Sequence, residues 1–300
     1  MLKPKPKIIV ILGPTATGKS NLAVRMAKAV KGEIVSADSR QVYRGLTIGS
    51  GKITKREMRG IPHHLLDVAS PKTTYTAQKY VHDAQKIITD VLHRKHIPIV
   101  VGGTGLYIDA LVDGVIFPEV PPNFLLRKKF EKKSPAQLFV LLKKKDPQRA
   151  RTIDKQNKHR LIRALEIVDV LGKVPLQKKK SAFTALHIGL NLPPEKLKTK
   201  IHKRLLARMK GGMVAEVMKL RKAGLSWKRF AELGLEYKYV ALFLQKKLSK
   251  QEILEKLETE IVRYAKRQMT WFKRDKRIKW FRPVKDARNI EDIVKQFLVS

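Results

Sequence analysis

Cysteine is absent from this 300-residue sequence, and acidic residues and long apolar segments are scarce. Without cysteine the chain forms no disulfide and no thiolate metal site, which fits a reducing, cytoplasmic location. No stretch approaches the roughly 20 consecutive apolar residues of a membrane span, so we expect neither a membrane anchor nor a signal peptide. With 43% hydrophobic residues, the chain can still bury the core of one large domain or two.

Acidic residues number 26 against 65 lysines and arginines, which gives a formal net charge of +39. This much positive charge repels itself in a compact fold, and a polyanionic partner relieves the repulsion. Nucleic acid is the leading partner and an acidic membrane surface the second. A general preference of the source for lysine would explain part of the excess equally well.

The strongest motif is an eight-residue loop near the amino terminus. It follows an apolar run at 8–12, which predicts a strand, and it precedes a helical pattern at 21–30. This order of strand, G-x-x-x-x-G-K-S loop and helix is the P-loop signature. Such a loop binds a diphosphate. Its residues are Gly13, Pro14, Thr15, Ala16, Thr17, Gly18, Lys19 and Ser20.

Each part of this loop has a physical task. Gly13 and Gly18 permit backbone angles closed to other residues, so successive amide N–H groups turn inward around an anion. The start of the next helix adds unpaired donors and partial positive charge. Lys19 brings a full charge, and Ser20 offers a hydroxyl to a Mg2+ ion carried by the phosphates. The loop alone does not say whether the phosphates belong to ATP.

A second short strand, predicted at 33–37, delivers Asp38 at its carboxyl end. Ligands of open α/β sheets bind beyond the carboxyl ends of the strands, so we expect Asp38 to emerge beside the phosphate cradle. A carboxylate facing a diphosphate is repelled unless it has a function. Asp38 is therefore a candidate general base, and the alternative is a helix cap or turn residue.

The segment that follows contains four glycines between Gly45 and Gly60, and we expect a loop with a short helix that moves over the site. Next come His63, His64 and Asp67, which invite a metal site. Adjacent side chains point in different directions, however, and no third ligand has suitable spacing, so we expect no zinc there.

A helix is predicted at 76–94, and a third strand at 97–101 ends in Gly102, Gly103 and Thr104. ATP-hydrolysing P-loop proteins usually hold magnesium with an aspartate at such a position. Small residues instead let a backbone or a flat ligand come close, which leaves space for a base or an alkyl chain. This departure weakens an ATP-dependent interpretation.

Four blocks together resemble the tRNA isopentenyltransferase family, in particular bacterial tRNA dimethylallyltransferases. They have the family's order and spacing, and nearly the whole chain can be followed; the blocks are 13–20, 38–44, 62–67 and 102–107. The resemblance implies transfer of a dimethylallyl group from dimethylallyl diphosphate to the exocyclic amine of the adenosine 3′ of the anticodon. The P-loop would then hold a leaving diphosphate rather than ATP.

The resemblance also implies roles for single residues. Lys19, the loop amides and Mg2+ on Ser20 would stabilise the departing diphosphate. Asp38 would accept the amine proton, and Arg204 would be a second cation on the diphosphate. Thr104 matches a threonine at the transfer channel, and Thr17 stands where serine is more usual. The segment that would contact tRNA is Asp38, Ser39, Arg40 and Gln41.

Past residue 115 the pattern changes to helical signals and dense lysines, including a helix predicted at 157–171. We expect an α/β fold with a P-loop NTPase-like core of parallel sheet flanked by helices, at 1–116 and 183–300, and a small all-helical insertion at 117–182. The family resemblance implies that the insertion binds the tRNA anticodon stem-loop. We expect Lys178–Lys180 to form a flexible segment that connects the insertion back to the core. Its contact segment would be His159, Arg160, Leu161, Ile162 and Arg163.

In that segment Arg160 and Arg163 share a helix face, which suits phosphates or a stacked base, although a merely solvated face is the alternative. A last long helix is predicted at 250–272 and an edge strand at 278–281. Cations along this stretch suit RNA, whereas Tyr264 and Trp271 are assigned to the core. Residues 233–237 stand where the family more often has Gly-Tyr-Lys.

Three other functions remain open. A P-loop small-molecule kinase would share the cradle but has no need of a basic insertion. An RNA-binding ATPase or non-catalytic RNA-binding protein would share the charge but would not require Asp38. A prenyltransferase acting on free adenine nucleotides is the nearest alternative. We expect the chain to act on tRNA in the cytoplasm as a monomer, with no membrane partner.

Overall fold

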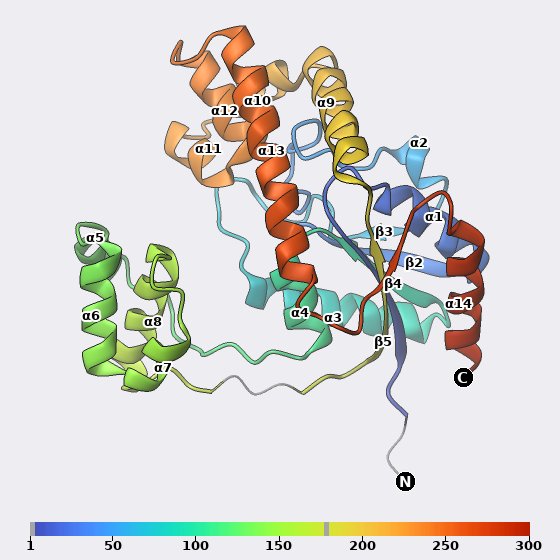
Figure 1. The fold of residues 1–300 in the computed structure, drawn as a ribbon, viewed down its shortest axis with the longest axis horizontal. Helices are drawn as coiled ribbons and strands as arrows, with labels where there is room; N and C mark the ends of the chain where they lie inside the picture. Colours follow the sequence, from blue (N-terminus) through green and yellow to red (C-terminus); the bar gives the residue numbers. More distant parts are fainter. Residues whose placement is uncertain (1–3, 177–179) are drawn as a thin grey trace. The chain divides into compact units, whose positions relative to one another are not determined.

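The computed structural model describes residues 4–176 and 180–300. These residues form two compact units (Figure 1): an α/β unit that runs to Gly114 and resumes at Ser181, and a helical unit from Val115 to Lys180. Part of the expected return segment, Lys178 and Lys179, lies outside the described residues. No helix in the described part of the chain is both long and apolar enough to cross a membrane.

A six-stranded sheet forms the centre of the α/β unit, with strand order β3-β2-β4-β1-β5-β6 and every neighbouring pair parallel. The chain turns to one side of β1 for β2 to β4 and to the other for β5 and β6, so the carboxyl end of β1 lies at a topological switch point. The strands are β1 Lys7–Leu12, β2 Gly32–Ala37, β3 His63–His64, β4 Ile97–Gly102, β5 Thr184–Leu190 and β6 Lys279–Phe281.

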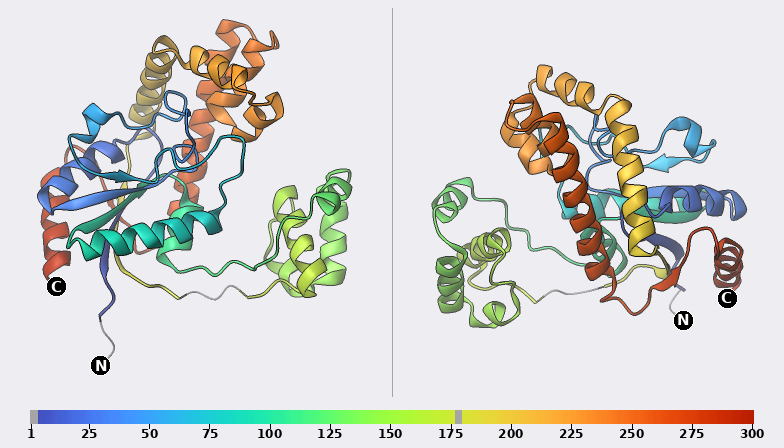
Figure 2. Two further views of the ribbon diagram at one scale, coloured as in Figure 1. Left: turned by 180° about the vertical axis from the view of Figure 1, so that it is seen from behind. Right: turned by 45° about the horizontal axis from the view of Figure 1, so that its top comes forward.

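Both faces of the sheet are covered, which is why the central strands are apolar along their whole length. The face that carries Ile9 and Ile11 is buried under α1 (Lys19–Ala29) and the carboxyl-terminal α14 (Ala287–Val299). Figure 2 shows α3 (Ala77–His93) along the opposite face. Burial on both sides holds the carboxyl ends of β1, β2 and β4 in fixed register, and the functional loops leave from those ends.

The remaining helices of this unit extend the α/β core. The short ones are α2 Lys55–Met58 and α4 Gly105–Val112. A group of helices follows β5 and stands above the carboxyl ends of the strands (Figure 1), namely α9 Pro194–Lys210, α10 Met213–Lys222, α11 Trp227–Leu233, α12 Leu235–Leu244 and α13 Lys250–Phe272.

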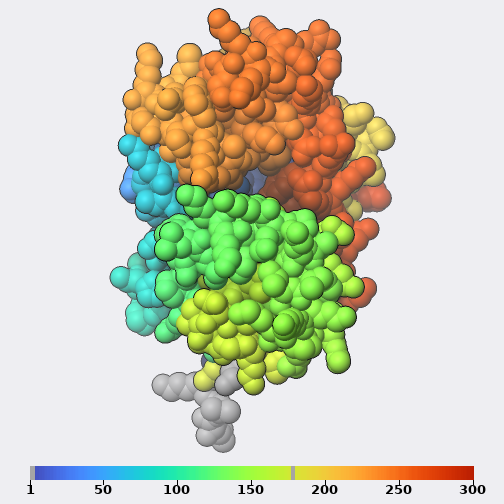
Figure 3. Space-filling model, turned by 90° about the vertical axis from the view of Figure 1, so that its left-hand side faces the viewer, coloured from blue at the N-terminus to red at the C-terminus, as the bar shows by residue number. Residues whose placement is uncertain are grey.

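The helical unit has its own apolar core, and its surface is the green part of Figure 3. Glu166 is buried beneath that surface, where it accepts hydrogen bonds from Arg127 at 2.7 and 2.8 Å and from the backbone N–H of Asn123 at 2.9 Å. Its helices are α5 Phe124–Glu131, α6 Pro135–Lys145, α7 Pro147–Thr152 and α8 Lys158–Leu171.

The α/β class with a parallel sheet flanked by helices is confirmed. The strand predicted as the third is the fourth along the chain, because His63 and His64 form a two-residue strand at the sheet edge. The predicted edge strand is present as β6, and the sequence analysis missed α14. That helix is amphipathic, so its apolar face was available as a signal.

Candidate active site

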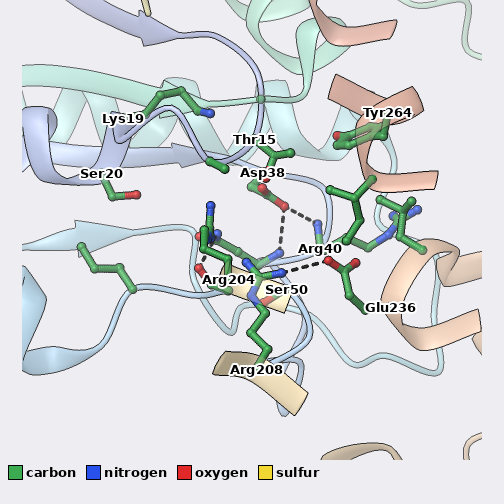
Figure 4. Close-up of a pocket in the computed structure, with 18 of the residues that line it drawn as sticks. Thr15, Lys19, Ser20, Asp38, Arg40, Ser50, Arg204, Arg208, Glu236 and Tyr264 are labelled. Carbon is green, nitrogen blue, oxygen red and sulfur yellow. Dashed lines mark hydrogen bonds and ion pairs between the residues drawn. The ribbon is translucent and has the colours of Figure 1, made fainter. Parts of the chain in front are cut away.

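A cavity of about 510 Å³ opens at the carboxyl ends of β1, β2 and β4 (Figure 4). Its walls come from the P-loop, the segment after β2, the loop at 49–51, and helices α9, α12 and α13. Every wall belongs to the α/β unit. The residues that line the cavity include Thr15, Lys19, Ser20, Asp38, Arg40, Ser50, Gly103, Arg204, Arg208, Glu236, Tyr264 and Gln268.

The P-loop has the backbone form that its glycines predict. Gly13 has φ 140°, and a Cβ at this position would collide with the carbonyl oxygen of Leu190 on β5. Gly18 has φ 93° and caps the amino end of α1. The hydroxyl of Thr17 is buried and donates to the carbonyl oxygen of Pro14 at 2.9 Å, so it holds the loop rather than facing a ligand.

Lys19 lies at the start of α1, and its ammonium donates to the carbonyl oxygen of Pro14 at 2.6 Å. Burial, and next the positive charge of Arg204, lower the pKa of Lys19 to about 7, while Asp38 opposes the shift. Without a bound anion, the positive charge of Lys19 is therefore only partly balanced by nearby negative charge. Ser20, the next residue, is exposed to the cavity.

Asp38 follows β2, as expected, and lines the same cavity as Lys19 (Figure 4). Its Oδ1 accepts hydrogen bonds from the backbone N–H groups of Arg40 at 2.8 Å and Gln41 at 3.2 Å. The Thr104 hydroxyl accepts from the N–H of Ser39 at 3.0 Å, which joins this turn to the end of β4. One carboxylate oxygen thus shapes the turn, and none of the described residues donates to Oδ2.

A second cation reaches the cavity from α9. Burial and the neighbouring Arg208 lower the pKa of Arg204 to about 10. Arg208 donates to the buried carboxylate of Glu236 at 2.9 Å and to the carbonyl oxygen of Gly49 at 3.2 Å. Within the described part of the chain Arg204 has no hydrogen bond or ion pair. Glu236 thus balances Arg208, and the charge of Arg204 is left for a ligand.

Residues 47–50 of the loop that we expected to move over the site are held by hydrogen bonds. The carboxylate of Glu216 on α10 accepts from three consecutive backbone N–H groups, those of Thr47, Ile48 and Gly49, at 3.0, 2.6 and 3.0 Å. Tyr237 donates to Glu216 at 2.9 Å and accepts from the N–H of Ser50 at 3.1 Å. The segment at 233–237, whose role the sequence left open, therefore holds this wall of the cavity.

The histidine block has a structural role. His64 and His96 each contact the buried carboxylate of Glu33 at 2.6 Å, and Arg94 donates to both of its oxygens. Asp67 pairs with the buried Lys52 at 2.6 Å. Among the described residues no three His, Asp or Glu side chains are arranged to hold a metal ion.

In the helical unit, the predicted contact segment divides into two kinds of residue. Leu161 and Ile162 on α8 are 0% and 3% exposed and belong to the core, so an RNA-contacting role for these two side chains is wrong. Arg163 donates to the carbonyl oxygen of Val120 at 2.8 Å and to Glu166 at 3.3 Å. His159 and Arg160 are exposed and remain candidates for contact with a ligand.

The sequence analysis missed several residues of the cavity wall. Tyr264 is half-buried and lines the cavity, so its assignment to the core is wrong. Trp271 is also only half-buried, and its indole N–H donates to Asp109 at 2.8 Å. Gln268 is buried among the apolar positions of α13. A polar residue on an apolar helix stripe was the available signal for Gln268.

Comparison with known proteins agrees with this geometry. The family model described as IPP transferase matches residues 41–275. A tRNA dimethylallyltransferase of Anoxybacillus flavithermus is 37% identical over 296 residues, which cover 96% of this chain and 95% of the relative. Another from Pelotomaculum thermopropionicum is 41% identical over 286 residues, with coverages of 93% and 91%.

Solved structures give the same result. The full-length tRNA isopentenylpyrophosphate transferase of Bacillus halodurans matches with a TM-score of 0.75 and 32% identity, covering 97% of this chain and 96% of that one. A eukaryotic dimethylallyltransferase acting on tRNA matches with a TM-score of 0.85 and 25% identity, with coverages of 98% and 80%. With a P-loop cavity of this form and relatives matched along nearly their whole length, the chain belongs to the IPP transferase family of tRNA dimethylallyltransferases.

Proposed function

We propose that this protein transfers the dimethylallyl group of dimethylallyl diphosphate to the exocyclic amine of an adenosine, the one 3′ of the anticodon in tRNA. One observation carries the proposal. The cavity is lined by a P-loop lysine, by Arg204 without an ion-pair partner among the described residues, and by Asp38 beside the small residues that end β4. A diphosphate fits the two cations, and a flat acceptor base fits the space beside Asp38.

The chain's own groups supply the chemistry of such a transfer. The allylic C–O bond breaks and its electron pair leaves with the diphosphate, while the amine nitrogen forms the new N–C bond. Positive charge builds on the allyl carbon and negative charge on the leaving oxygen. We expect Lys19, Arg204 and the P-loop amides to stabilise that oxygen, because fixed donors in a partly dry site need no reorganisation. Asp38 takes the proton released by the amine.

A Mg2+ ion fits this site only as a companion of the diphosphate. Ser20 offers one exposed hydroxyl at the cavity wall, and the described residues form no cluster of ligating carboxylates or histidines. Mg2+ usually keeps several waters and phosphate oxygens and few protein ligands, so Ser20 with the diphosphate is a reasonable donor set. When bound, the ion would neutralise charge on the leaving group.

We assign tRNA binding to two surfaces. One is the turn from Asp38 to Gln41, which lines the cavity. The other includes the exposed His159 and Arg160 of the helical unit. RNA recognition of this kind depends on shape and on an unstacked base taken into a pocket. We infer that the protein acts as a monomer in the cytoplasm, where tRNA is modified.

The test is incubation of the protein with unmodified tRNA and Mg2+, with dimethylallyl diphosphate labelled in the alkyl group or with γ-labelled ATP. We expect label on tRNA from the prenyl donor alone, and none after replacement of the target adenosine by guanosine. Label transferred from ATP to any acceptor would favour a kinase. Efficient prenylation of AMP in the absence of tRNA would favour a nucleotide prenyltransferase.

A further inference from the structure

Gln268 is a buried polar side chain that the chemistry above does not use. It lies on α13 among apolar positions and is 7% exposed. Its Oε1 accepts a hydrogen bond from the backbone N–H of Thr15 in the P-loop at 2.9 Å. Its Nε2 donates to the carbonyl oxygen of Gly103, just after β4, at 2.8 Å. One amide therefore joins two loops that are far apart in sequence.

Only an amide of this length fulfils both contacts. An N–H needs an acceptor and a carbonyl needs a donor, so the orientation of the amide is determined by its two partners. A glutamate would accept from Thr15 but would oppose the Gly103 carbonyl with negative charge. A methionine of similar length would leave both backbone groups without a partner in a buried place, which is costly.

The two partners belong to neighbouring loops of the cavity, which follow the paired strands β1 and β4. Thr15 is part of the loop that receives the diphosphate, and its N–H is engaged by Gln268 rather than by a ligand. Gly103 precedes Thr104, whose hydroxyl holds the turn of Asp38 through the N–H of Ser39. There is no space between Gly103 and the amide of Gln268, because a Cβ on Gly103 would collide with Nε2 of Gln268. The contact thus links the P-loop to the loop whose Thr104 holds the turn of Asp38.

We propose that Gln268 is a positioning residue for the transfer step, which sets the separation between the P-loop and the Asp38–Thr104 edge. The proposal rests on the proposed function. A reaction between two bound partners depends steeply on their alignment, and a misplacement of about 1 Å can cost on the order of a hundredfold in rate. Both polar atoms of its amide are engaged by backbone groups, so we expect its loss to affect turnover more than binding.

The experiment measures steady-state kinetics of Gln268→Met with tRNA and dimethylallyl diphosphate. We expect kcat to fall on the order of tenfold to a hundredfold, while KM for the donor and Kd for tRNA change by less than about threefold. Gln268→Glu should also lose kcat, because it restores only one of the two contacts. The matched control is Gln251→Met, which makes the same change at an exposed position of α13.

A second approach alters the contact from its other side. Gly103→Ala should push the amide away and lower kcat with Gln268 intact. If both changes act through one contact, the double variant Gly103→Ala with Gln268→Met should lose little more than either alone, by roughly less than threefold. If the loss of kcat in the double variant equals the product of the losses in the two single variants, the proposal is overturned.

Further outcomes separate this inference from the proposed function. A wild-type protein that prenylates tRNA, together with a Gln268→Met variant of unchanged kcat, would overturn the positioning role alone. So would a variant whose KM for the donor and Kd for tRNA worsen as much as its kcat falls, because that pattern indicates a general structural role. A wild-type protein that transfers no prenyl group would overturn the proposed function and this inference with it.

Discussion

The ammonium of Lys19 donates a hydrogen bond to the carbonyl oxygen of Pro14, 2.6 Å away in the same loop. The lysine is thus held over the cradle before any anion arrives, although burial and Arg204 disfavour its charge. A diphosphate would reverse this balance by bringing negative charge next to the ammonium. The protein therefore has a measurable proton linkage at its donor site.

We predict that donor binding takes up a proton above neutral pH. The pKa of Lys19 is lowered to about 7 in the free protein and rises when diphosphate binds. Binding at pH 8 should then take up about one proton, and affinity should fall as pH rises from 7 to 9. Calorimetry in buffers of different ionisation enthalpy measures the uptake. Lys19→Arg is the control, because arginine stays protonated and this variant should bind the donor without taking up a proton. Equal proton uptake by the variant and the wild type would refute the assignment to Lys19.

Asp38→Asn should abolish turnover while tRNA still binds. The amide keeps one oxygen for the N–H groups of Arg40 and Gln41, so the turn is retained, but it cannot accept the amine proton. Loss of a general base typically costs about 10²- to 10⁴-fold in rate. Single-turnover prenylation and filter binding of tRNA separate the two effects. Activity within a few-fold of wild type would remove Asp38 from the mechanism.

Glu216→Ala should release the loop at 47–50. Three backbone N–H groups and the Tyr237 hydroxyl would lose their acceptor, at a cost of about 1–3 kcal/mol in the free energy of unfolding. Urea denaturation measures that cost, and limited proteolysis should show cleavage within the loop. Glu260→Ala, which breaks an exposed ion pair with Arg263, should cost less than about 1 kcal/mol. Equal effects of the two changes would contradict the anchoring.

Arg160 and Arg163, three residues apart on α8, should respond differently to alanine substitution. Arg160 is exposed, so its loss should weaken tRNA binding without lowering Tm. The number of counterions released on binding, given by the salt dependence of the affinity, should fall by about one. Arg163 holds Val120 and Glu166, so its loss should destabilise the helical unit. Binding at several salt concentrations and hydrogen exchange of residues 115–176 measure these effects. Unchanged binding for Arg160→Ala would exclude that side chain from the RNA contact.

Local sequence determined the elements whose signals are contiguous. The P-loop follows from glycines and a lysine at fixed spacing, because φ near 140° at Gly13 excludes a side chain. The helix at 250–272 was predicted with its observed ends, and the structure adds a capping box of Ser249 and Glu252 at its start. Asp38 was placed beside the cradle by a general property of parallel sheets, not by its neighbours.

Tertiary structure alone decided which residues act together across long separations. Glu216 has the sequence context of an ordinary exposed helix residue, yet its carboxylate accepts from three backbone N–H groups of a loop roughly 170 positions earlier. Tyr264 has the spacing of a core residue but lines the cavity. Helical periodicity says which face of a helix is apolar, and it does not say what that face meets. Gln268 shows the same limit, because nothing in its sequence context places it against the loops that follow β1 and β4.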